Sequence, residues 1–120
     1  MIDIQTFTDI MDSLACELPE PFFDELNLGI SVSSEAKRHP QSRGDDLYIM
    51  GEYFRNVMGR GIVIYYGSFC RIHGALSLDQ LEEEMRRTLR HEFRHHLEGL
   101  AQEDGLERED ARQLREYLDR

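Results

Sequence analysis

The chain has 120 residues, of which 40% are hydrophobic and 32% charged, a composition typical of one small globular domain and too short for a two-lobed enzyme. Its 24 Asp and Glu residues exceed its 14 Lys and Arg residues, so the net charge of −10 disfavours nucleic acid and anionic lipid. No apolar run approaches the roughly 20 residues that span a bilayer, and the acidic start does not look like a targeting peptide. We therefore expect a single cytoplasmic domain, residues 1–120, that binds neither nucleic acid nor membrane.

The first part of the chain is predicted to hold one helix and one short strand. Apolar residues recur at helical spacing over residues 4–17, and Pro19 ends that helix. Residues 22–28 fit a further helical turn, and residues 30–33 fit a strand. The polar segment 34–46 contains proline and glycine, so we expect it to be a loop.

Two apolar runs in the middle of the chain predict a small sheet. Residues 47–54 and 61–69 are rich in Ile, Val, Tyr and Phe, and a turn with Gly59 separates them. We expect two neighbouring strands. Neither run alternates cleanly between apolar and polar residues, which predicts that helices cover both faces of the sheet.

A long helix is predicted to follow the sheet. Ser77 and Gln80 fit a capping box, in which the serine hydroxyl accepts a backbone N–H and the glutamine reaches back. We expect this helix to run to about Glu98 and to end at Gly99 in a left-handed conformation. One stripe of the helix would pack on the sheet; its members are Leu78, Leu81, Met85, Leu89, Phe93, His96 and Leu100. A last helix is predicted over residues 107–118.

The long helix contains the pattern His-Glu-x-x-His at His91, Glu92 and His95. Residues four apart are rotated by only about 40° and displaced by about 6 Å, so both imidazoles can converge on one zinc ion. Zinc is a Lewis acid that lowers the pKa of bound water from about 15.7 toward 7, which lets a nearby carboxylate remove its proton at neutral pH. Glu92 is the expected general base, and peptide-bond hydrolysis is the expected reaction.

The alternative interpretation is a solvated helix face that is rich in His and Glu by chance. The context argues against it, because the pattern lies on a capped helix after two strands and both histidines flank the apolar stripe. His96 lies on the stripe itself, about 100° from His95, so it cannot join the other two on one ion. We expect His96 to be a core histidine with a backbone partner.

The sequence also resembles the small bacterial zincin-like metallopeptidase family, whose members are described as minimal zincins. The resemblance covers about residues 15–100 and is most specific at Thr-Leu-Arg-His-Glu-Phe-Arg-His-His, residues 88–96. It implies a compact α+β fold in which a small sheet packs against the zinc-binding helix, with N- and C-terminal helices. It also implies that His91 and His95 are zinc ligands and that Glu92 is the general base of a peptidase.

The third zinc ligand does not transfer directly from the family. Members often carry Gly and Asp at the positions of Glu98 and Ala101. Because Gly99 is displaced by one residue, a longer turn would bring Asp104 back over the histidines, and we favour Asp104 as the ligand. Glu98 and Glu103 are the competing candidates. Without a third ligand, two histidines would bind zinc weakly and the protein would be catalytically silent.

Two functions therefore follow from the sequence. The first is a zinc-dependent metallopeptidase that binds a peptide or protein substrate along an exposed sheet edge. The alternative is a catalytically silent zincin-like protein whose acidic surface and C-terminal helix bind a basic partner. The sequence carries no signal for an oligomeric state.

Overall fold

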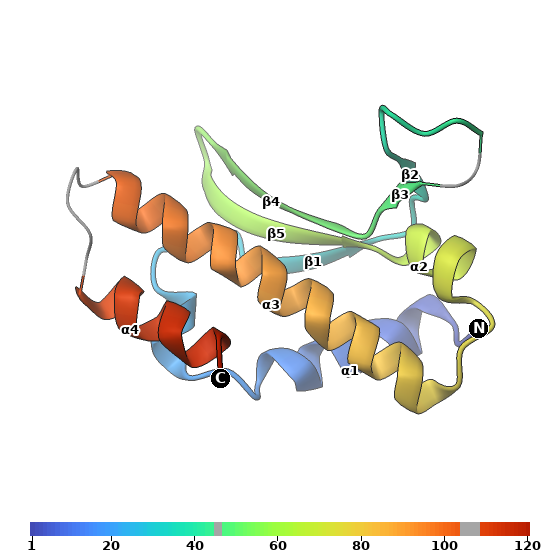
Figure 1. The fold of residues 1–120 in the computed structure, drawn as a ribbon, viewed down its shortest axis with the longest axis horizontal. Coiled ribbons are helices and arrows are strands. Elements are labelled where there is room, and N and C mark those ends of the chain that lie inside the picture. Colours follow the sequence, from blue (N-terminus) through green and yellow to red (C-terminus); the bar gives the residue numbers. More distant parts are fainter. Residues whose placement is uncertain (45–46, 104–108) are drawn as a thin grey trace.

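The computed structural model describes residues 1–44, 47–103 and 109–120 of the chain. Its elements in chain order are α1 (Ile4–Ala15), the 3₁₀ turn η1 (Glu20–Phe23), β1 (Ile30–Ser33), β2 (Lys37–Arg38), β3 (Tyr48–Ile49), β4 (Gly51–Asn56), β5 (Gly59–Tyr65), α2 (Tyr66–His73), α3 (Leu78–Glu103) and α4 (Glu109–Leu118). Helix α3 lies between the sheet on one side and helices α1 and α4 on the other (Figure 1). The α+β fold predicted from the sequence is confirmed. None of the helices within the described ranges is both long and apolar enough to cross a bilayer.

The main sheet has three strands in the order β1-β5-β4, so β4 is an edge strand. Strand β1 runs parallel to β5, and β4 runs antiparallel to it. Strands β2 and β3 form a separate two-stranded pair. Helix α3 packs against β4 and β5. On the opposite face Ser31 is exposed and Phe54 and Val63 are half-buried, so the prediction of helices covering both faces is wrong.

The core forms where the apolar stripe of α3 meets the sheet and α1. Within that stripe Leu81 is 3% exposed and Met85, Leu89 and Phe93 are fully buried. Facing residues with at most 1% exposure come from α1, η1 and β5; they are Phe7, Met11, Phe22, Ile62 and Ile64. Burial of each such side chain contributes about 1.5–3 kcal/mol, so this contact fixes the position of α3 on the sheet.

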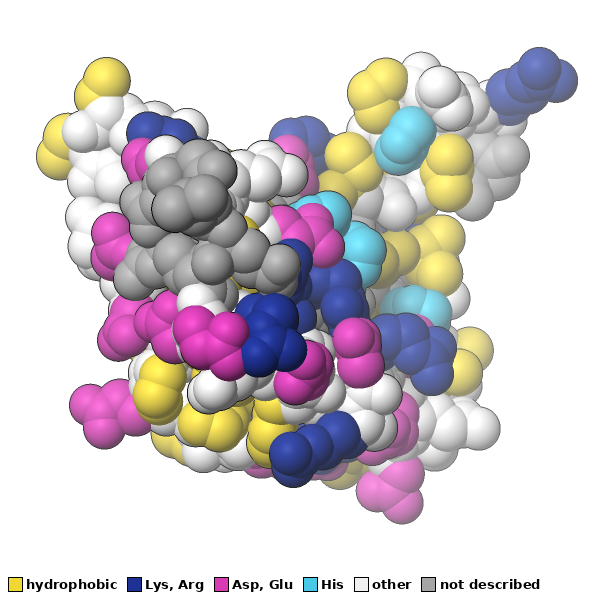
Figure 2. Space-filling view, turned by 60° about the vertical axis from the view of Figure 1, so that its left-hand side comes forward, with side chains coloured by type: hydrophobic (Ala, Val, Ile, Leu, Met, Phe, Trp, Pro, Cys, Tyr) yellow, Lys and Arg dark blue, Asp and Glu magenta, His cyan; other side chains and the backbone are white. Residues whose placement is uncertain are grey.

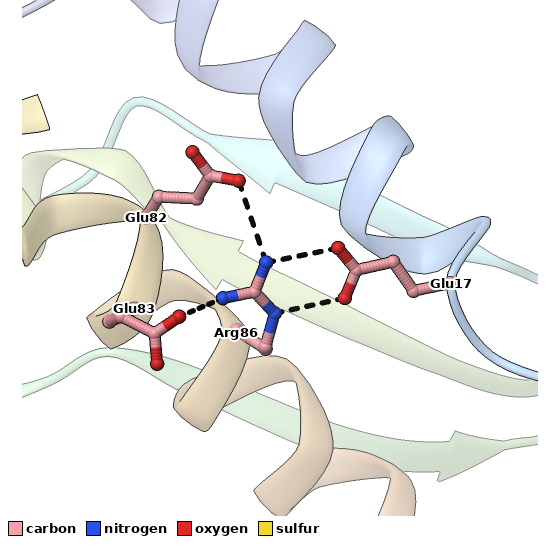
Figure 3. Close-up of polar contacts among 4 residues, drawn as sticks. All are labelled: Glu17, Glu82, Glu83 and Arg86. Atoms are coloured by element: carbon pink, nitrogen blue, oxygen red, sulfur yellow. Dashed lines mark hydrogen bonds and ion pairs between the residues drawn. The ribbon is translucent and has the colours of Figure 1, made fainter. Parts of the chain in front are cut away.

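An arginine of α3 holds the chain that follows α1. Two nitrogens of Arg86, Nε and Nη2, each donate to a carboxylate oxygen of Glu17 at 2.9 Å. The same guanidinium is bonded to Glu83 and lies 3.5 Å from an oxygen of Glu82 (Figure 3). Fork-shaped pairing of this kind is directional, so it orients the end of α1 against α3.

The strand predicted over residues 61–69 ends early, and helix α2 replaces its second half. At Gly67 a Cβ atom would lie 2.5 Å from the backbone nitrogen of Ala36, so only glycine allows this close approach. Ser68 is fully buried and accepts a hydrogen bond from the backbone N–H of Lys37 at 2.9 Å. Contact with this neighbouring segment therefore overrides the local preference for a strand. The predicted loop also contains β2, which pairs with β3.

The start of α3 is predicted correctly and its end is not. The backbone N–H of Gln80 donates to the Ser77 hydroxyl at 3.2 Å, and the N–H of Ser77 donates to the Gln80 side chain at 3.1 Å, as a capping box requires. The helix does not end at Gly99 but continues to Glu103. Leu100 and Ala101 in this extra turn are 4% and 8% exposed, so their burial favours continuing the helix.

His96 is a core histidine, as predicted. It is fully buried, with Nε2 2.8 Å from the carbonyl oxygen of Asp24 and Nδ1 3.1 Å from the hydroxyl of Tyr53. Since a carbonyl oxygen only accepts, Nε2 carries the proton and Nδ1 accepts from the tyrosine. Burial lowers the pKa of His96, so the ring stays neutral at physiological pH.

This burial predicts acid-sensitive stability. The unfolded chain, in which the His96 pKa is about 6.5, takes up a proton that the folded chain rejects. The free energy of unfolding should therefore fall as the pH drops below about 6.5, by at most about 1.4 kcal/mol per pH unit from this residue. The free energy of unfolding can be measured with urea, in a chelator, from about pH 7.5 to about pH 5.5. It should fall less steeply with decreasing pH in His96→Gln than in the control His39→Gln. Equal slopes would contradict the prediction.

Candidate functional site

Two exposed histidines on α3 direct their rings toward one another. His91 and His95 are one helical turn apart, and their Nε2 atoms lie 3.1 Å from each other. Two nitrogens that bind one tetrahedral zinc ion at about 2.0–2.1 Å are about 3.3–3.4 Å apart. A change of a few tenths of an ångström would therefore let both rings share one ion. The structure brings together the two side chains that the sequence predicts as ligands.

A hollow of about 490 Å³ adjoins these rings. One wall is Gly51, Glu52 and Tyr53 of the edge strand β4, and the other is the flank of α3 from His91 to Gln102. The hollow therefore lies between a helix and an edge strand that has no further strand beside it in the described sheet.

Glu92 is buried beside the two histidines and is fixed by the sheet. The residue is 6% exposed, and its Oε1 accepts the backbone N–H of Tyr53 at 2.9 Å. Burial raises the pKa of Glu92, while the neighbouring His91 and His95 and the N–H of Tyr53 oppose that rise. The carboxyl group is thus held at the rim of the hollow, and its pKa lies above the usual value for a glutamate.

A second acid in the hollow, Glu52, escaped the sequence analysis. Its Oε1 accepts a hydrogen bond from the hydroxyl of Tyr65 at 2.7 Å and is also paired with the ammonium of Lys37. The bond from Lys37 holds the pKa of Glu52 below its usual value, so this carboxylate stays charged. Its charge adds to the rise in the pKa of Glu92. No local pattern connects these residues, because they meet only when β2 and β4 come together.

Glu98 lies on the far side of the His95 ring from the converging nitrogens. Its Oε2 is 3.7 Å from Nδ1 of His95, whereas Nε2 of that ring faces His91. A carboxylate beside the second ring nitrogen orients a ligating histidine and raises its basicity. The position of Glu98 therefore suits an orienting role better than direct binding beside Nε2.

The remaining candidates for the third ligand are separated from the histidines or undescribed. Glu103 pairs with Arg55 at 2.8 Å and with Arg60, so its carboxylate is directed to the β4–β5 hairpin. Asp104, the favoured ligand, lies outside the described residues. Across the residues that the structure does describe, no three His, Cys, Asp or Glu side chains form a group that could hold a metal ion. His91 and His95 therefore fit as two zinc ligands, and the identity of the third ligand stays a prediction.

Comparison with known proteins identifies the family. Residues 29–114 match the sequence profile of the zincin-like metallopeptidases. A solved structure described as a conserved hypothetical protein from Thermo thermophilus is 34% identical, with a TM-score of 0.73 over 84% of this chain and 99% of that chain. No curated protein matches. The match covers both histidines, Glu92 and the strands that border them, so the resemblance found in the sequence is confirmed: this chain belongs to the zincin-like metallopeptidase family.

Proposed function

We propose that this protein is a zinc-dependent peptidase in which His91 and His95 hold the metal and Glu92 is the general base. The observation that carries the proposal is the 3.1 Å approach of the two Nε2 atoms at the rim of an open hollow. Without a metal ion this distance suits a hydrogen bond from the N–H of one neutral ring to the other ring, and zinc would replace that shared proton. Family membership supports the same reaction class. The cytoplasm remains the expected compartment.

Glu92 has the properties that a general base needs. Its Oε1 is occupied by the N–H of Tyr53, which leaves Oε2 to receive a proton from the attacking water and return it to the leaving amine. A bound zinc ion supplies Lewis-acid catalysis and lowers the pKa of water to the range of a carboxylate base. The raised pKa of Glu92 makes its carboxylate a stronger base toward the attacking water.

The edge of β4 is the proposed binding strand for the substrate. Gly51 and Tyr53 border the hollow, and at Gly51 a Cβ atom would lie 3.2 Å from the side chain of Thr88, so glycine allows α3 to pack closely on this edge. Main-chain hydrogen bonds to outward-facing groups of β4 other than the Tyr53 N–H, which Glu92 already accepts, would hold an extended peptide along β4 with its scissile carbonyl near Glu92. This mode of binding depends little on substrate side chains, which suits a chain of this size.

A second candidate function is a catalytically silent member that binds a basic partner through its acidic surface. It is favoured by the incomplete ligand group among the described residues, because two histidines and no third ligand bind zinc weakly. The two functions differ in what Glu92 contributes: a peptidase requires its carboxylate, and a silent binding protein does not.

The first test separates metal binding from catalysis. Glu92→Gln should retain zinc at one equivalent and lose hydrolysis of a fluorogenic peptide by at least about a hundredfold, since general-base catalysis contributes about 10²–10⁴-fold. His91→Ala should lose both, because one of two described ligands is removed. His39→Ala is the control and should change neither. Full zinc binding by His91→Ala, measured by metal analysis after dialysis, would refute the proposed site.

The second test identifies the third ligand. Asp104→Asn should weaken zinc affinity by more than the roughly 10- to 100-fold that loss of an orienting partner costs, while Glu98→Gln should fall within that range. Glu103→Gln should leave the affinity unchanged, because its carboxylate pairs with arginines of the hairpin. Competition with a chromophoric chelator measures all three variants. An unchanged affinity in Asp104→Asn would exclude Asp104.

The third test follows the protonation of Glu92. In the metal-free protein its pKa should lie above the usual 4.5, because burial favours the neutral acid. Zinc should lower that pKa, since a divalent cation nearby favours the charged carboxylate. Carbon NMR of the glutamate carboxyl groups, assigned with Glu92→Gln, measures both midpoints. The same midpoint with and without zinc would show that the ion does not sit beside Glu92.

A further inference from the structure

A second hollow of about 440 Å³ lies on the other flank of His91. It runs along α3 toward α4, and its lining includes Arg86, Arg87, Arg90, Arg94 and Leu118. His91 borders this hollow as well as the one against β4. A ligand in the second hollow, which we call the arginine hollow, would thus be adjacent to the proposed catalytic site.

The charge of the arginine hollow is opposite to that of the protein. The chain carries a net charge of −10, yet four arginines line this one depression. Figure 2 shows Lys and Arg side chains gathered beside histidines near the centre of one face, with Asp and Glu side chains around them. Charge of one sign concentrated beside a reaction site raises the local concentration of ligands of the opposite sign.

Three of the four arginines have acidic partners within the protein. Arg86 is bonded to Glu17 and Glu83 (Figure 3). Arg87 is paired with Glu84 at 3.0 Å, and Arg94 with Asp119. The acid that lines the hollow, Glu83, is therefore already committed to Arg86. These pairs reduce the charge that the three arginines offer to a ligand.

Arg90 differs from its neighbours. It is half-buried and makes no hydrogen bond or ion pair with any residue in the described part of the chain. The charge of Arg90 acts on Glu17, whose two carboxylate oxygens are both already bonded to Arg86. A guanidinium has five N–H donors in a planar fork that matches a carboxylate, so a half-buried one without a partner is suited to a ligand that brings its own carboxylate.

We propose that the arginine hollow is a carboxylate-binding subsite for the peptide substrate, with Arg90 as the residue that holds the carboxylate. The assignment of a peptide as the ligand rests on the proposed peptidase function. Because His91 lines both the arginine hollow and the hollow against β4, a carboxylate on Arg90 would be part of the same ligand that reaches the histidines. The carboxylate is either an Asp or Glu side chain or the C-terminus of the peptide. A long polyanion is disfavoured by the net charge of the protein.

The test measures binding apart from hydrolysis. Four fluorescein-labelled peptides of equal length, with one Glu or one Gln and with a free or amidated C-terminus, are titrated into full-length Glu92→Gln protein in zinc at low salt. At least one carboxylate-bearing peptide should bind about tenfold more tightly than the amidated Gln peptide. Adding Arg90→Gln should abolish that preference. Adding Arg71→Gln, which removes the same charge from an exposed site on α2, should preserve it.

The outcomes show whether the carboxylate comes from a side chain or from the C-terminus of the peptide. They also separate failure of the subsite from failure of the peptidase proposal. Preference for the free C-terminus over the amide identifies the terminal carboxylate, and preference for Glu over Gln identifies a side chain. Equal binding of all four peptides, equal losses in the Arg90 and Arg71 variants, or tighter binding of a labelled oligonucleotide would overturn the subsite. Thermal melts should show the Arg90 variant folded, since the residue has no partner in the described chain to lose. If Arg90-dependent binding is found and the unmodified protein cleaves none of the peptides, the subsite stands and the peptidase proposal fails.

Discussion

The site depends on one hydrogen bond, from the backbone N–H of Tyr53 to the carboxylate of Glu92. It joins the edge strand β4 to helix α3 at the point where the hollow opens between them. The bond fixes one oxygen of the acid, and the charge of its carboxylate is favoured by the two neighbouring histidines. Because the donor belongs to the backbone, the position of the strand and not the identity of residue 53 sets the geometry. In the proposed mechanism the strand therefore serves catalysis and substrate binding at once.

Electrostatics divide the surface of α3 into two flanks with different uses. On the β4 side the hollow that holds the histidines is also lined by Glu52, Glu92 and Glu98, so this flank is acidic. On the α4 side the lining is mostly arginine, and one of these arginines lacks an acidic partner among the described residues. Helix α3 thus presents its positive charge at the arginine hollow, although the protein as a whole is strongly acidic. Charge distribution, and not depth, would give so small a chain its selectivity.

Much of the fold follows from local rules that can be applied to the sequence directly. The capping box at Ser77, the apolar stripe of α3 and the four-residue spacing of the histidines are properties of one helix, so they could be predicted. Helix α2 could not, because its residues favour strands and only the close approach at Gly67 makes the helix preferable. The contacts of Tyr53 and Glu52, and the lack of an acidic partner for Arg90 among the described residues, could not be predicted for a similar reason. Each depends on which residues from other segments lie beside it in the fold.

His91 is the common wall of both hollows, and this has an evolutionary consequence. In the proposed site, replacement of that one ring would remove a ligand of the cation and at the same time open the two hollows to each other. A change at Glu92 or Arg90 would alter only reactivity or only ligand choice, whereas a change at His91 would alter both in one mutational step. What survives such a step is the fold, available for a new purpose.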